Sequence, residues 1–95
     1  MTEEYRELFG AVSALLFRHD PIGINFEGNA DEYDSETGTI LPRLKDCRSV
    51  QDVQTVVHEE FVRWFDRQTA GPPESYSDIS AEIWKLWNEH NRGDA

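Results

Sequence analysis

The amino-acid sequence predicts an all-α fold, a small four-helix bundle with a long acidic loop between helices one and two. Apolar residues recur at helical spacing in four segments, and no segment shows the alternating pattern of a strand. The later connections are short, which favours antiparallel neighbours. A chain of 95 residues, rich in large aromatic side chains, suits one hydrophobic core. We therefore expect a single domain over residues 1–95.

The first helix is predicted over residues 2–17, with Thr2 as its N-cap. Its apolar face comprises Tyr5, Leu8, Phe9, Val12, Leu15 and Leu16. It ends before Pro21, because proline disfavours helical geometry at the preceding Asp20, and Gly23 completes the features of a turn. A loop over residues 20–35 follows, and its apolar residues predict that part of it packs onto the bundle.

The second helix is predicted over residues 31–46, with Asp31 or Asn29 as its N-cap. Its apolar face comprises Tyr33, Thr37, Ile40, Leu41 and Leu44. Pro42 has no amide hydrogen to donate to the carbonyl of Gly38, so this helix is expected to be kinked or interrupted.

The third helix is predicted over residues 50–69, where Ser49 and Asp52 resemble a capping box. Its apolar face comprises Val53, Val56, Val57, Phe61, Trp64 and Phe65. Gly71 and two prolines end it, and the fourth helix is predicted over residues 73–91. The face of that helix comprises Tyr76, Ile79, Ile83, Leu86, Trp87 and His90.

The chain is strongly acidic, with nineteen Asp and Glu against nine Lys and Arg and a formal net charge of −10. Such a charge repels phosphate backbones and anionic lipid, so no nucleic-acid or membrane partner is expected. It attracts basic protein surfaces, although an acidic composition also serves solubility alone. Six acidic residues occur between positions 20 and 36 with no Lys or Arg among them: Asp20, Glu27, Asp31, Glu32, Asp34 and Glu36.

Cys47 is the only cysteine, which excludes an intramolecular disulfide and suits a reducing compartment. The first residues are acidic where a secretory signal would be basic, and no segment has the roughly 20 apolar residues of a membrane span. These features predict a cytoplasmic location.

No motif predicts catalysis, a metal site or a cofactor. His58 and Glu59 begin like a zinc-protease motif, but Val62 stands where the second histidine is required, so Glu59 and Glu60 are interpreted as solvated residues. Neither His58 nor His90 follows a glutamate by three positions, as a di-iron bundle requires. The oxygen-rich residues 25–36 lack the EF-hand spacing. The sequence therefore predicts no enzyme.

The run Phe17–Gly23, containing Asp20-Pro21-Ile22-Gly23, precedes the run Asp31-Glu32-Tyr33-Asp34 and the apolar residues Ile40, Leu41 and Leu44. This pattern resembles small, acidic, helical bacterial proteins of uncharacterised function whose core is a DP-[IV]-G turn and a DEYD run. Some of those proteins resemble immunity proteins encoded beside bacterial toxins. The resemblance covers roughly residues 5–66 and implies a non-enzymatic binding role, with Asp20, Gly23 and residues 31–34 as the matching positions.

The function predicted is a non-enzymatic protein-binding module, and its more specific form is an immunity protein that covers a basic surface of a toxin. The expected contact residues are the six acids of residues 20–36 together with Trp84, which lies off the apolar face of the fourth helix. The alternative is a homo-oligomeric accessory domain, such as a homodimer, in which Trp84 and its neighbours form the interface.

Overall fold

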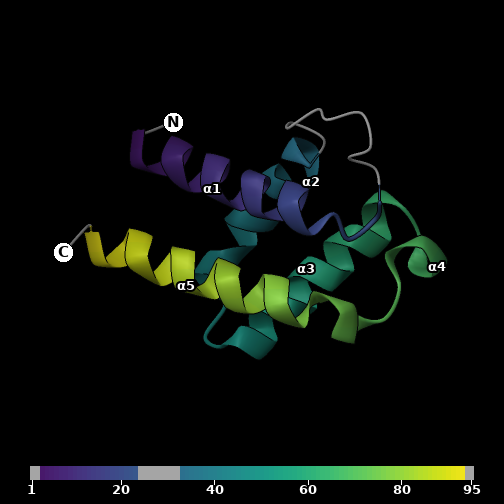
Figure 1. Cartoon of the computed structure of the whole chain (residues 1–95). Coiled ribbons are helices and arrows are strands. Elements are labelled where there is room, and N and C mark those ends of the chain that lie inside the picture. The colour runs from purple at the N-terminus through teal and green to yellow at the C-terminus, as the bar shows by residue number, and fades with distance from the viewer. Residues whose placement is uncertain (1–2, 24–32, 94–95) are drawn as a thin grey trace.

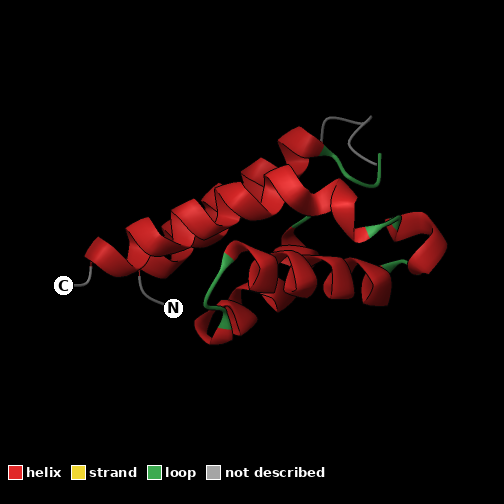
Figure 2. Ribbon diagram, turned by 90° about the horizontal axis from the view of Figure 1, so that it is seen from below, coloured by secondary structure: helices red, strands yellow, loops and turns green. Residues whose placement is uncertain are grey.

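The computed structural model describes residues 3–23 and 33–93, and every regular element in them is helical (Figures 1 and 2). The elements in chain order are α1 (Glu3–His19), α2 (Asp34–Ile40), the 3₁₀ helix η2 (Leu41–Asp46), α3 (Val50–Trp64), α4 (Arg67–Ala70), the 3₁₀ helix η3 (Pro73–Tyr76) and α5 (Ser77–Gly93). The predicted all-α class is confirmed. None of the described helices is long and apolar enough to cross a membrane.

The four main helices close into a ring around one core. Helix α5 packs against α1 and α3, and α2 packs against the same two helices from the other side. Helices α1 and α5 run antiparallel, so the beginning of α1 and the end of α5 lie at the same end of the molecule (Figures 1 and 2). This arrangement leaves the α1–α5 pair as one long outer face.

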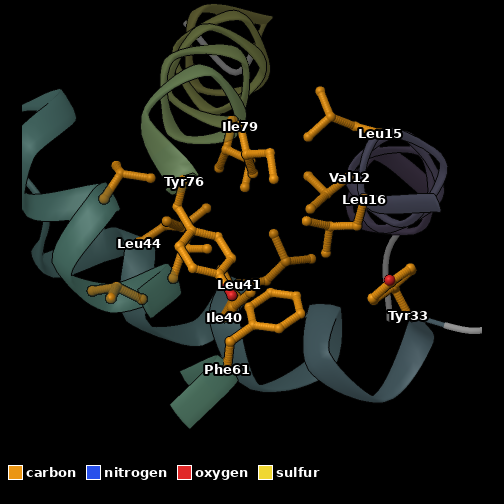
Figure 3. Close-up of a cluster of buried hydrophobic side chains, with 14 of the residues drawn as sticks. Val12, Leu15, Leu16, Tyr33, Ile40, Leu41, Leu44, Phe61, Tyr76 and Ile79 are labelled. Atoms are coloured by element: carbon orange, nitrogen blue, oxygen red, sulfur yellow. The ribbon is translucent and has the colours of Figure 1, made fainter. Parts of the chain in front are cut away.

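The core is built from apolar residues of all these helices, and large aromatic side chains lie at its centre (Figure 3). Phe61 of α3 is fully buried between Tyr33 and Tyr76, with ring centroids 6.0 Å and 5.2 Å away, respectively. Aromatic pairs at these separations add to the free energy of burial itself. Segments that lie far apart in sequence are therefore held together by three rings.

The second helix is interrupted where Pro42 predicts it. Helix α2 gives way at Leu41 to η2, in which Pro42 occupies the first turn and needs no amide partner. Helix α2 begins at Asp34, after Tyr33 as the N-cap residue, and the predicted start at Asp31 lies outside the described residues.

The predicted third helix is too long. Helix α3 ends at Trp64, and the Asp66 carboxylate accepts a hydrogen bond of 2.6 Å from the Thr69 amide, which caps the separate short helix α4. A side chain that caps a new helix competes with continuation of the old one. At the other boundary, α1 continues to His19, where Asp20 adopts a left-handed φ of 49° and its amide donates to the Leu16 carbonyl.

Candidate protein-binding surface

Residues from the turn Asp20–Gly23 and from the run 31–34 are joined by hydrogen bonds in the structure. Tyr33 is fully buried, and its hydroxyl donates to Asp20 Oδ1 at 2.7 Å while accepting from the Ile22 amide at 3.3 Å. The turn after α1 is thus tied to the residue that precedes α2. Gly23 has a φ of 79°, a conformation that only glycine adopts without strain. Asp20, Tyr33 and Gly23 therefore have a structural role.

The predicted acidic contact segment is only partly exposed. Asp34 is half-buried and accepts a short hydrogen bond from the Ser13 hydroxyl of α1. Glu36 is 4% exposed, which corrects its assignment to an exposed acidic surface: it lies one turn before Ile40, on the face of α2 that points to the core. Glu27, Asp31 and Glu32 lie outside the described residues.

The exposed tryptophan is Trp64, and Trp84 is half-buried against the core. Trp64 is 45% exposed and donates its indole N–H to Thr39 Oγ1 at 3.0 Å. Helical spacing places Trp64 on the core face, one turn after Phe61, but it is the last residue of α3 and meets the polar side chain of Thr39. The spacing of apolar residues does not show where along a helix the packing against the core ends. For this reason the sequence did not predict Trp64 as a contact residue.

The outer face of the α1–α5 pair contains a continuous groove. Two adjoining hollows of about 310 and 450 Å³ share Ala11, Leu86 and Glu89 as lining residues. The side chains of Leu8 and Leu15 form part of the apolar floor, and they are buried because the same residues face the core. The small side chains on α1 leave the floor open to another molecule.

Charged residues on the rim of this groove are distributed unevenly. Glu4, Glu7 and Glu89 line the end near the beginning of α1 and the end of α5. Arg18 and Lys85 line the other end together with Glu82. The groove is therefore acidic at one end and mixed at the other.

Several of the chain's cations are occupied by its own carboxylates. Arg18 lies 2.9 Å from Glu82, which also contacts His19 at 2.5 Å. Arg43 bridges Glu59 and Glu60 at 2.8 Å each, and these contacts raise the pKa of Arg43. Arg18 and Arg43 are therefore already paired within the chain.

The interpretation of Glu60 as a solvated residue is wrong. Glu60 is 2% exposed, because it lies on the face of α3 that contains Val56 and Val57. Its Oε2 accepts a hydrogen bond from Arg43 and lies 4.0 Å from Arg63, and Arg43 also contacts Glu59. This ion pair joins η2 to α3.

The side chains of His58, Tyr76 and Cys47 are engaged in packing. His58 Nε2 hydrogen-bonds with the Gly71 carbonyl at 2.9 Å, and its ring lies 5.9 Å from that of Tyr76. Tyr76 donates to the Ala70 carbonyl at 2.6 Å, and burial raises its pKa to about 12. Burial also raises the pKa of the Cys47 thiol, which disfavours the reactive thiolate. Within residues 3–23 and 33–93, no three acidic, histidine or cysteine side chains group as a metal site would require.

No protein-family model, curated protein or solved structure matches the chain. The resemblance based on the Asp20-Pro21 turn and on residues 31–34 therefore stays a prediction.

Proposed function

We propose that the chain is a non-enzymatic protein-binding module whose partner presents a basic surface. The observation that carries the proposal is the unbalanced charge: the chain has a net charge of −10, and the cations Arg18 and Arg43 are already paired with its own carboxylates. A surface of one sign raises the rate of encounter with an oppositely charged protein and suppresses encounter with acidic ones.

An immunity protein is the specific form of this function that we favour. A toxin that acts on nucleic acid carries a basic surface for phosphates, and an acidic protein can cover that surface without any chemistry of its own. The resemblance of residues 5–66 to small acidic proteins supports this form. The proposed contacts are the exposed carboxylates, which differ from the set predicted from sequence because Glu36 is buried.

The proposal is tested by affinity capture with the tagged chain from cells of the source organism, at low salt, with elution by a salt gradient. We expect one basic protein, released as salt screens the charges, since the Debye length falls from about 30 Å at 0.01 M to about 3 Å at 1 M salt. Purified partner and chain should then form a complex of fixed stoichiometry. An acidic or neutral partner, retained equally at all salt concentrations, would contradict the proposal.

A homo-oligomeric accessory domain is the second candidate, and the exposure of Trp64 favours it. A tryptophan of this exposure is a typical anchor of a protein interface. Sedimentation equilibrium over a wide range of concentration separates the two functions, because a self-associating chain shows a concentration-dependent mass. A mass of one chain at every concentration would remove this candidate.

A further inference from the structure

We propose that the α1–α5 groove is the docking site for an amphipathic helix with lysine or arginine on its flanks. The inference deepens the proposed function and rests on it, because it names the surface and the kind of partner segment. The observations that carry it are the spacing of the groove residues, the small side chains in its floor and the charges on its rim.

The spacing of the lining residues is that of a helix-packing seam. Besides Leu8 and Leu15 in the floor, the α1 residues that line the groove are Glu4, Glu7, Ala11, Ala14 and Arg18, which follow one another at alternating intervals of three and four. This spacing places them in one stripe along α1, with the two alanines in its middle and charged residues toward both of its ends. The stripe spans roughly 21 Å at 1.5 Å per residue, so the occupant has about four helical turns.

Helix α5 provides a second stripe of the same kind, with Glu82, Leu86 and Glu89 separated by four and three residues. Two adjacent antiparallel stripes receive the apolar ridge of a third helix between them. Ala11 and Ala14 have the smallest side chains in the groove and permit a helix axis to approach to about 8 Å. The groove therefore fits a helix better than it fits an extended segment.

The rim charges select the partner. Glu4, Glu7 and Glu89 have no ion pair within the described part of the chain, so they are available to cations of the occupant. The groove carries four carboxylates against the two cations Arg18 and Lys85. A second copy of a chain with net charge −10 would meet repulsion here, whereas a basic helix would meet attraction.

The test uses a labelled peptide of about three heptads, with leucine and alanine along one face and lysine on both flanks, titrated by fluorescence anisotropy at low salt. Ala14→Trp fills the groove without touching the core, because Ala14 is exposed. Thr55→Trp, on the exposed face of α3, is the control for the added ring. We expect saturable 1:1 binding that Ala14→Trp weakens by about 10-fold or more and Thr55→Trp by less than about 2-fold.

The charge arm compares two triple variants with the same change in net charge. One reverses the rim carboxylates through Glu4→Lys, Glu7→Lys and Glu89→Lys. The other reverses exposed carboxylates away from the groove, namely Asp46, Glu74 and Asp78, each to Lys. Each set includes one residue in the first turn of a long helix, Glu4 or Asp78, so their effects on helix stability are similar. We expect the rim variant alone to lose about 10-fold or more in affinity.

Three other outcomes would refute docking in the groove, and each has a different consequence for the proposed function. Equal weakening by both triple variants, with no effect of Ala14→Trp, would mean attraction by net charge alone, and the basic-partner function would stand. No binding of the peptide by the unmodified chain would overturn the groove, while the capture experiment judges the function separately. A dimer in sedimentation that Ala14→Trp abolishes would show that the occupant is a second copy and would refute both.

Discussion

Replacing Tyr33 by Phe removes the hydroxyl that joins the turn after α1 to the start of α2, and so tests whether the pattern of residues 17–34 serves folding. The hydroxyl donates to the Asp20 carboxylate at 2.7 Å and accepts from the Ile22 amide at 3.3 Å. A hydrogen bond to a charged group contributes about 1.5–3 kcal/mol, and the longer bond adds little. We expect Tyr33→Phe to lower the free energy of unfolding by about 2 kcal/mol.

That loss is large for a domain of this size, whose whole stability is expected to lie between about 5 and 14 kcal/mol. It corresponds to a fall in Tm of roughly 8–16 °C. Urea unfolding followed by tryptophan fluorescence gives the free energy, and circular dichroism gives the Tm. The ring itself is retained in the variant, so its packing against Phe61 is preserved.

Asp20→Asn provides the matched partner for a double-mutant cycle. Asparagine keeps an acceptor oxygen and tolerates the φ of 49°, so it removes the charge without adding backbone strain. A coupling energy of about 1 kcal/mol between the two changes is expected for groups in direct contact. The reasoning is refuted if Tyr33→Phe changes stability by less than about 0.5 kcal/mol, or if it abolishes partner binding while stability stays unchanged.

Three further predictions concern residues elsewhere in the ring of helices. Arg43→Met should lower the free energy of unfolding by about 2–4 kcal/mol, because it leaves the buried Glu60 carboxylate without the cation of Arg43. Urea unfolding measures this loss. Arg43→Lys should recover part of it. Phe61→Ala should cost about 3–5 kcal/mol and Trp64→Ala less than about 1, because only Phe61 is fully buried; equal losses in thermal unfolding would contradict the assigned exposures. Hydrogen bonds from the helix that Asp66 caps lower its pKa, so its stabilisation of α4 is complete above the ordinary value of 3.8 and is lost as the pH falls through the lowered value. NMR titration of the backbone amides of α4 in Asp66→Asn should show no such transition.

Much of the fold is predictable from spacing because large apolar residues are few and regularly placed. The interruption at Pro42 follows from a missing amide, and the ring of four helices follows from four amphipathic segments. The end of α3 was not predictable from apolar spacing, since Phe65 continues the pattern and the decisive group is the Asp66 carboxylate that caps the next helix.

The burial of two acidic residues was predictable from helical spacing, but their charge argued against it. Glu36 lies three residues after Tyr33 and four before Ile40, and Glu60 lies three after Val57, so helical spacing places both on core faces. Interpreting them as surface residues followed from the cost of burying a carboxylate. For Glu60 the structure offsets that cost with Arg43, which comes from η2, and a contact between distant elements is not visible in a local pattern.

The candidate binding surface was not predicted from the sequence, because the residues that form it are not unusual. Residues of unusual identity, such as Asp20 and Tyr33, attract attention in a sequence, yet their side chains are directed at one another. The α1–α5 groove is instead lined by leucines, alanines and charged residues, which are ordinary residues of amphipathic helices. The groove is indicated by the spacing of residues along α1 and along α5, and only the fold brings these two helices side by side. A partner that reads this surface would depend on shape and charge, so changes in the groove should alter binding while leaving stability nearly unchanged.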